Sequence, residues 1–481
     1  MRPHRAAPLR LPLTAAVCAL LASAPVLRAQ EPAAPTDRYL GTWKGVLEMP
    51  GALLRLALDV TRSGDGLGGS ITSLDQGNAR IPVTLFVRND SLIADMPSIV
   101  ATFSATADGD SLRGSFQQNG ATGRISFAHL SSTIVPVVAR RPQEPVGTLP
   151  YNAVDVAFPS ASGVVIAGTL TTPTGAGPWP AVVLISGSGP HDRDERMVGH
   201  RPFLVLSDYL TRRGIAVLRY DDRGVGSSTG TFVQSTTADF AEDAEAAVRF
   251  LAGRPEVDRT RIGMIGHSEG GVIAPIVATR SKDVAFIVLM AAPGVTGDSL
   301  LTLQNRAQLR IAELPPSEAE PLARLTNRLL HAVSGARDSA DARARVVEIE
   351  DQYVAAQVPS RREALRANLT GRNGQLLMPW MRYFLSFDPR LALSQVHVPV
   401  LALNGMLDSQ VLYQENLGAI GSALKTANNA DFEIVELAGL NHLFQTAQTG
   451  GISEYSVIEE TIAPAALQQI GDWILRHTQR R

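Results

Sequence analysis

The chain has little cysteine, lysine or aromatic character, and each shortage excludes a class of protein. A single cysteine, Cys18, among 481 residues leaves no pair for a disulfide framework or a thiolate metal cluster. Only three of the 44 basic residues are lysines, the arginines are interspersed with acids, and the formal net charge is −2, so we expect no nucleic-acid partner. Beyond the N-terminus no apolar run is long enough to span a membrane, which indicates a globular mature chain.

The N-terminus has the organisation of a secretory signal peptide. Three arginines precede an apolar run over residues 11–27, and small residues surround a cleavage position after Ala29. We therefore expect residues 1–29 to be removed and the mature protein to be secreted or periplasmic. The alternative is a retained membrane anchor, which the two prolines within the short apolar run disfavour.

Residues 39–131 show the pattern of a small all-β domain. In LLRLALDV (53–60) apolar residues alternate with others, as in a half-buried strand, and the pair Asn119 and Gly120 is typical of a hairpin turn. We predict a small antiparallel barrel or sandwich. Trp43 is expected either to plug one end of its core or to line a ligand cavity.

A proline-rich segment, 132–150, predicts a linker, and the pattern then changes. Near-continuous apolar strands such as AVVLIS and FIVLMA alternate with amphipathic helices over 151–481, which is typical of a parallel sheet covered on both faces. The predicted fold class is α/β, with an eight-stranded, mostly parallel sheet. The helix-prone segment 297–392 interrupts the alternation between the sixth and seventh strands and predicts a helical cap.

Two segments fit the pattern GxSxG. Ser268, in MIGHSEGGVIAP, follows a short apolar strand and precedes a helix rich in Ala, Ile and Val. This is the setting of a nucleophile elbow, a strained turn that exposes the serine hydroxyl and needs small neighbours, here Gly266 and Gly270. Ser228, in GSSTG, has no such strand and helix around it, so its match is interpreted as a coincidence.

A serine hydroxyl needs a base, and the base needs a group that orients it. Asp408 follows a strand in LALNGMLDSQV, and His442 follows the last strand in VELAGLNHLF. With these motifs, residues 151–481 resemble the α/β-hydrolase superfamily, and the resemblance implies a catalytic triad of Ser268, Asp408 and His442. Taken singly, Asp408 could instead cap the next helix, and His442 could be an ordinary loop histidine.

The resemblance also implies two backbone N–H donors for an oxyanion. Glu269, directly after the nucleophile, would supply one. The loop SGSGPHDRDE after the third strand would supply the other, for which we expect Ser188, because Gly187 and Gly189 let the backbone approach closely. This loop departs from the HGGG form of the superfamily.

The segments SGSGPHDRDE and YDDRGVGSSTG are also similar to secreted bacterial hydrolases labelled prolyl-oligopeptidase-like (S9- and S33-like), some of which act as esterases. HDRDE contains one histidine and an interleaved arginine, so we interpret it as a salt-bridged loop in preference to a metal site. We expect Arg223 to pair there with Asp192 or Asp194.

Four aromatic residues repeat at helical spacing near the end of the predicted cap. They are Trp380, Tyr383, Phe384 and Phe387. Such a stripe is typical of core packing, and a wall of an acyl-binding site is the alternative interpretation.

These observations predict a secreted serine hydrolase that cleaves carboxylic esters through an acyl-enzyme, without a cofactor or metal. The expected substrate is a small-molecule ester or a short peptide. A peptidase of the aminopeptidase or prolyl-oligopeptidase kind would use the same triad and remains the alternative. A non-catalytic binding protein, with the β domain holding a ligand, is a further alternative. The sequence does not indicate the oligomeric state.

Overall fold

A computed structural model describes most of the chain beyond the predicted signal peptide. The prediction for residues 1–29, the turn at residues 119–120 and the first part of the predicted linker lie outside the described residues. No helix in the described part is both long and apolar enough to cross a membrane. The described residues are 36–49, 52–63, 66–73, 79–96, 101–118, 121–130, 141–311, 316–357, 359, 362, 366, 369, 376–455 and 457–479.

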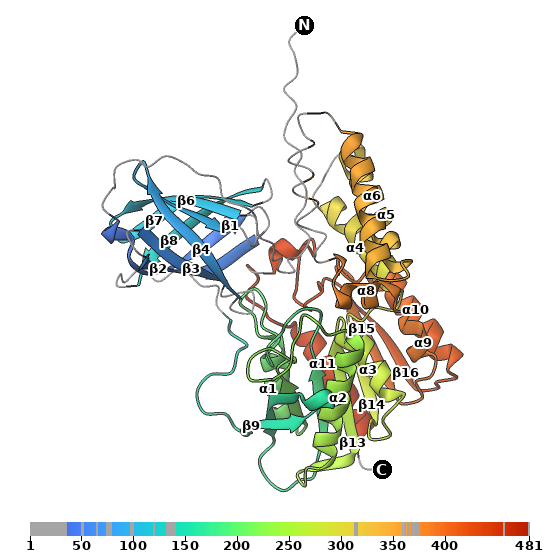
Figure 1. Cartoon of the computed structure of the whole chain (residues 1–481). Coiled ribbons are helices and arrows are strands. Elements are labelled where there is room, and N and C mark those ends of the chain that lie inside the picture. The colour runs from blue at the N-terminus through green and yellow to red at the C-terminus, as the bar shows by residue number, and fades with distance from the viewer. Residues whose placement is uncertain are drawn as a thin grey trace. The chain divides into compact units, whose positions relative to one another are not determined.

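The N-terminal strands close into an eight-stranded antiparallel barrel, so the barrel is the correct choice of the two predicted architectures (Figure 1). Each strand pairs with the next, and β8 returns to β1. A short 3-10 helix, η1 (Asp37–Tyr39), precedes them. The strands are β1 (Gly41–Met49), β2 (Ala52–Ser63), β3 (Gly66–Ser73), β4 (Ala79–Arg88), β5 (Ser91–Met96), β6 (Ala101–Asp108), β7 (Ser111–Gln118) and β8 (Ala121–His129).

The strand alternation fills the barrel with side chains. Leu56, Leu58 and Val60, which share one face of β2, are all buried in its core. Trp43 is 1% exposed in the same core, and its Nε1–H donates to the carbonyl oxygen of Tyr39 at 2.8 Å. Because a buried indole N–H needs an acceptor, this bond allows the tryptophan to sit inside an apolar core.

The second sheet also has eight strands, in the order β16-β15-β14-β13-β11-β12-β10-β9. Parallel pairing joins β12 to β11, β11 to β13, and β13 through β16 in turn. The strands are β9 (Asn152–Pro159), β10 (Val165–Thr172), β11 (Trp179–Ile185), β12 (Ala216–Tyr220), β13 (Val257–His267), β14 (Phe286–Met290), β15 (Val400–Gly405) and β16 (Phe432–Leu437).

This sheet is mixed, which corrects the expectation of a mostly parallel one. β9 and β10 pair antiparallel, and β10 pairs antiparallel with β12. The connection between β9 and β10 contains only the short 3-10 helix η3 (Ala161–Gly163). A connection this short can join only antiparallel neighbours, because parallel strands need a crossover of a dozen or more residues.

Helices cover both faces of the mixed sheet (Figure 1). Alternate residues of β11 point to opposite faces: Val182 and Leu184 pack in one core, and Val183 and Ile185 in the other. The first core contains α1 (Pro202–Arg212) and α11 (Pro464–Thr478), and the second contains α2 (Thr237–Ala252), α3 (Gly270–Ala278) and α10 (Tyr413–Thr426). The two-faced burial explains why these strands are continuously apolar.

Helices also occupy the long interruption between β14 and β15. They are α4 (Gly297–Ile311), α5 (Pro316–Ser334), α6 (Ser339–Ala355), α8 (Pro379–Ser386) and α9 (Pro389–Leu393). A last 3-10 helix, η4 (Ile452–Glu454), precedes α11. The assignment of 297–392 as a cap stays a prediction.

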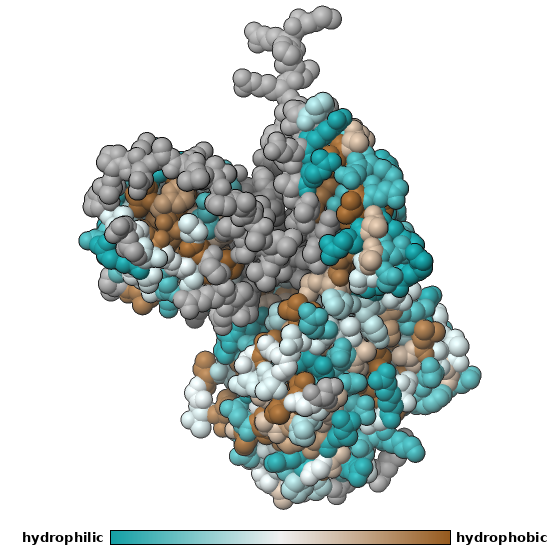
Figure 2. All heavy atoms as spheres, in the orientation of Figure 1, coloured by the Kyte–Doolittle hydropathy of each residue, from teal (hydrophilic) through white to brown (hydrophobic). Residues whose placement is uncertain are grey.

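The chain divides into two compact units. One comprises Met1–Val138, Gln308–Thr326 and Val346–Gln375, and the other comprises Ala139–Ala307, Asn327–Arg345 and Leu376–Arg481. Exposed large hydrophobic residues are dispersed, for example Val146 at 89% and Val457 at 62%. The second unit accordingly shows brown spheres scattered among teal and white ones in Figure 2.

Arg223 pairs with Asp243, so the expected pairing with Asp192 or Asp194 is wrong. Nε of Arg223 lies 2.7 Å from Oδ2 of Asp243, and Nη2 lies 2.9 Å from Oδ1. Both side chains are buried, at 6% and 2% exposed. Asp243 lies on α2 one turn after Asp239, and the backbone carbonyl oxygen of Asp239 also accepts from Arg223. The guanidinium is therefore bound by two residues on the same face of one helix.

Removing this guanidinium should destabilise the second unit strongly. Arg223→Ala would leave the buried Asp243 carboxylate without its cation, so we expect a loss of about 3–5 kcal/mol in the free energy of unfolding. Urea unfolding followed by circular dichroism measures it. Arg259→Ala is the control, because Arg259 is 67% exposed beside Asp283 and should leave the midpoint unchanged. Equal midpoints for the two variants would contradict the burial argument.

Candidate active site

Ser268 occupies the sharp turn between β13 and α3. Its φ of 52° lies in the left-handed region, which a non-glycine residue seldom adopts. Its N–H donates to the carbonyl oxygen of Met290 at 2.8 Å, and its own carbonyl accepts from Gly271 at 2.9 Å. The half-buried serine therefore sits on a firmly hydrogen-bonded turn at the carboxyl end of the strand.

Two glycines allow strand and helix to meet at this turn. A Cβ on Gly266 would lie 2.0 Å from the carbonyl oxygen of Gly270, and a Cβ on Gly270 would lie 2.1 Å from that of Ile185. Both obstructing atoms belong to backbone and cannot rotate away. A Cβ on Gly187, in the loop after β11, would lie 3.2 Å from Cβ of Ser268. The glycines of the GxSxG motif are thus required by close backbone approach.

Asp408 and His442 form a buried pair. Nδ1 of His442 lies 2.8 Å from Oδ2 of Asp408, and the side chains are 6% and 0% exposed. The other carboxylate oxygen accepts from the N–H groups of Gln410 and Val411 at 2.8 and 2.9 Å. Because the carboxylate only accepts, Nδ1 carries the proton and the lone pair of a neutral His442 is on Nε2.

His442 lies beside the elbow. Its ring centroid is 4.9 Å from that of His267, the residue before Ser268, and its carbonyl oxygen is 3.1 Å from Nε2 of His267. Within the described chain no hydrogen bond joins the Ser268 hydroxyl to His442. Such bonds are often long in hydrolases without substrate. The three predicted residues follow the carboxyl ends of β13, β15 and β16, and their meeting as a triad stays a prediction.

The two residues expected to supply oxyanion donors are neighbours in space. The Ser188 side chain lies close enough to the Glu269 carboxyl group to lower its pKa, against the larger effect of burial, which raises it. Gly187 lies against the serine, and Gly189 has a φ of 114°, which glycine adopts without strain. The positions of the two N–H groups relative to a substrate remain a prediction.

The side chain of Glu269 is a buried hydrogen-bond acceptor that the sequence pattern did not indicate. Its Oε1 accepts from Oγ1 of Thr237 at 2.6 Å and from Nε1 of Trp380 at 2.7 Å. Burial raises the pKa of Glu269, against the opposing effects of Thr237, Trp380 and Ser188. The carboxyl group thereby joins the elbow to helices α2 and α8.

The aromatic stripe of α8 packs in the core. Trp380 stacks on Phe384 at 5.2 Å between centroids, and Tyr383 stacks on Phe387 at 5.6 Å. Phe384 is 6% exposed and lies in an apolar cluster with Val411. The packing supports the core interpretation, while the Trp380 indole also reaches Glu269.

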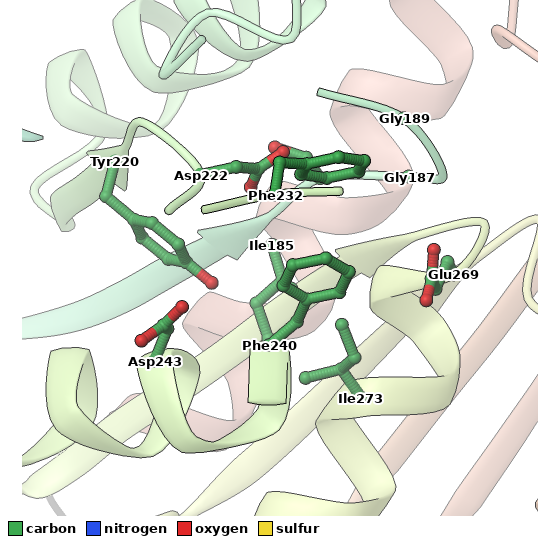
Figure 3. A pocket seen from close by; sticks show the side chains of 11 residues that line it. Ile185, Gly187, Gly189, Tyr220, Asp222, Phe232, Phe240, Asp243, Glu269 and Ile273 are labelled. Atoms are coloured by element: carbon green, nitrogen blue, oxygen red, sulfur yellow. The ribbon is translucent and has the colours of Figure 1, made fainter. Parts of the chain in front are cut away.

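A small cavity opens beside the elbow (Figure 3). Glu269 lies toward one end, and Tyr220 and Asp243 lie toward the other. Burial raises the pKa of Asp222 well above its usual range, although Asp222 accepts from the N–H of His191 at 2.9 Å. The lining residues are Ile185, Ser186, Gly187, Gly189, Tyr220, Asp222, Phe232, Phe240, Asp243, Glu269 and Ile273.

Ser228, the other GxSxG serine, has a structural role. Its hydroxyl donates to the carbonyl oxygen of Asp221 at 2.7 Å and accepts from the N–H of Ala167 at 2.9 Å. In the neighbouring HDRDE segment, Arg193 pairs with the carboxylate of Asp221 at 2.8 Å. Among the described residues, no group of three or more His, Cys, Asp or Glu side chains is arranged to hold a metal ion.

The α/β-hydrolase superfamily is defined by a sheet of this kind that carries an elbow serine between a strand and a helix. An aspartate and then a histidine follow the serine along the chain. Residues 162–430, more than half of the chain, match the family described as X-Pro dipeptidyl-peptidase (S15 family). The chain belongs to this family.

Individual relatives share the hydrolase region. Esterase EstD of Thermotoga maritima is 34% identical over 169 residues, which cover 31% of this chain and 40% of EstD. Esterase FrsA of an Enterobacter species is 29% identical over 147 residues, which cover 30% and 33%. The match thus spans less than half of either relative. An esterase structure from Pyrococcus furiosus has a TM-score of 0.42 at 16% identity and covers 71% of this chain and 98% of its own.

The elbow should not tolerate a methyl group at its second glycine. In Gly270→Ala the new Cβ would meet the Ile185 carbonyl, so the turn must shift. We expect a lower melting temperature and a fall of roughly 100-fold in p-nitrophenyl ester hydrolysis. Gly418→Ala is the matched control, because a Cβ in that α10 position meets nothing within 4 Å and should stabilise by roughly 0.5–1 kcal/mol. Normal turnover by Gly270→Ala would refute the steric account.

Proposed function

We propose that this protein is a serine hydrolase that cleaves carboxylic esters through an acyl-enzyme. The observation that carries the proposal is the 2.8 Å bond between Asp408 and Nδ1 of His442, made beside a serine held in a left-handed turn. A buried imidazole whose Nδ1 is bound to a carboxylate presents Nε2 as a base, and the hydroxyl of the half-buried elbow serine is the group it would serve.

In the proposed reaction His442 Nε2 takes the proton of Ser268 as Oγ attacks the ester carbonyl. The proton then passes to the leaving alcohol, and the acyl group stays on Oγ. Water enters, His442 takes its proton, and attack on the acyl carbon releases the acid and restores the serine. Asp408 orients the imidazole and stabilises its charged form in each half of the cycle.

The negative charge that develops on the substrate oxygen needs hydrogen-bond donors. The proposed reaction requires no cofactor. We assign the backbone N–H groups of Glu269 and Ser188 to the oxyanion. The close approach of Gly187, directly before Ser188, to the nucleophile supports this assignment, because it brings the two segments that carry the donors together.

Two findings bear on the substrate. The relatives EstD and FrsA are named esterases, which favours ester hydrolysis. The family match to X-Pro dipeptidyl-peptidases favours the second candidate, cleavage of short peptides by the same residues. We further propose that the helices after β14 act as the cap and that the N-terminus directs export.

Replacing the nucleophile should abolish turnover. We expect Ser268→Ala to reduce hydrolysis of a short p-nitrophenyl ester by roughly 10³-fold or more. The matched control is Ser228→Ala, in the other GxSxG segment, where the hydroxyl serves only the backbone and turnover should persist. Mass spectrometry of protein treated with a fluorophosphonate should find the label on Ser268. A label elsewhere, or full activity of Ser268→Ala, would remove the proposal.

A substrate panel should separate the two candidate activities. If the ester proposal is right, kcat/KM for p-nitrophenyl butyrate will exceed that for Xaa-Pro p-nitroanilides and for aminoacyl p-nitroanilides. The Ser268→Ala variant measures the uncatalysed background for each compound. A preference for an Xaa-Pro anilide would instead assign the family's peptidase activity to this chain.

A further inference from the structure

A second histidine–carboxylate pair lies next to the elbow, and the proposed reaction gives it no role. Nδ1 of His267 is 2.8 Å from Oε1 of Glu195, and the two side chains are 5% and 1% exposed. Nε2 of the same imidazole is 3.1 Å from the carbonyl oxygen of His442. Both ring nitrogens of His267 therefore face oxygen atoms.

The partners determine the charge of this imidazole. A carbonyl oxygen only accepts, so Nε2 must carry a proton to bond to His442. Oε1 of Glu195 also accepts from the N–H of Gly187 at 2.8 Å, as an ionised carboxylate would. If Glu195 is ionised, Nδ1 must carry a second proton. The ring is then an imidazolium and Glu195 is its counter-ion.

Electrostatics favour the charged pair. Burial alone would lower the pKa of His267, but the charge and hydrogen bond of Glu195 outweigh burial and raise it. Burial alone would raise the pKa of Glu195, but the charge and hydrogen bond of His267 lower it. Stability from the pair is lost as pH rises through the folded pKa of His267 or falls through that of Glu195, so it is fully present between their ordinary pKa values of 4.5 and 6.5. Asp408 also faces His267, and His191 faces Glu195.

The pair connects three strand ends. Glu195 belongs to the loop after β11, in which it binds Gly187 directly before Ser188. His267 is the last residue of β13 and directly precedes Ser268. His442 follows β16. The His267–Glu195 pair thus joins the end of the serine's own strand to the segment of the expected oxyanion donor and to the backbone of the expected base.

We propose that the His267 imidazolium, neutralised by Glu195, is a positioning group that holds the backbone of His442 and the Gly187 segment against the nucleophile elbow. The inference rests on the proposed function, because that function gives His442 and Ser188 their roles. The competing state is a neutral pair in which Glu195 carries the proton and donates it to Nδ1. That state keeps the contact but contains no cation.

Nuclear magnetic resonance of the unmodified full chain distinguishes these states. In protein labelled with ring-15N histidine, both nitrogens of His267 should show the chemical shifts of protonated nitrogen at neutral pH. Loss of the signals in His267→Gln assigns them. An unprotonated Nδ1 would overturn the proposal. The measurement can be repeated in Ser268→Ala, so it does not depend on turnover.

Glu195→Gln tests the consequence for catalysis. The neutral amide oxygen can still accept from His267 and Gly187, but the ring would lose its charge. Nε2 would then turn a lone pair toward the His442 carbonyl, and this tether would break. We expect kcat for the p-nitrophenyl ester to fall roughly 10- to 100-fold, with KM changed less than about twofold.

The control and the second variant separate positioning from general instability. Asp431→Asn removes the carboxylate of an exposed pair, 3.3 Å from Nε2 of His477, and should leave kcat unchanged. His267→Gln and the double variant with Glu195→Gln should each lose about as much kcat as Glu195→Gln, because the pair acts as one unit. A folded Glu195→Gln with wild-type kcat would overturn the inference, and if that variant does not fold, the resonance experiment decides.

The two proposals fail in different ways. Full turnover by Ser268→Ala would overturn the serine mechanism, whereas the charge of His267 would still be read from the spectrum. Inactive Ser268→Ala together with a fully active Glu195→Gln would overturn only the positioning role.

Discussion

The left-handed turn at Ser268 is the constraint on which the rest of the site depends. Close approach of β13 and α3 at Gly266 and Gly270 makes the turn sharp. A sharp turn leaves the serine half-buried while its two neighbours, His267 and Glu269, are almost fully buried. Two polar side chains are therefore forced into the interior beside the nucleophile, and each must find hydrogen-bond partners there.

Those partners come from segments far away in the chain. His267 is satisfied by Glu195 and by the backbone of His442, and Glu269 by Thr237 and Trp380. The cost of burying a polar group thus links the elbow to the loop after β11, to the loop after β16 and to two helices. The same requirement explains why Arg223 is bound by an α2 carboxylate in the core.

Much of the fold could be predicted because hydrophobic periodicity and the order of strands along the chain depend on residues that are neighbours in sequence. The alternation in β2, the continuous apolar strands and the glycines around Ser268 each follow from neighbouring residues. The second sheet has the expected eight strands. The mixed character of the sheet was missed, because strand direction depends on which neighbour β10 finds across the sheet. The partner of Arg223 was missed because the carboxylates of Asp192 and Asp194 were equally suitable in charge.

By itself the sequence determined the chemical groups available and their order: an elbow serine, then an aspartate, then a histidine, each directly after an apolar strand. The tertiary structure alone decided which atoms meet. It set the 2.8 Å contact of Asp408 with His442, the Glu195–His267 pair and the Trp380–Glu269 bond. The physical reason is that hydrogen bonds and ion pairs act over a few ångströms, whereas the residues that make them are separated by tens to hundreds of positions, and only the packing of strands and helices brings them within that range.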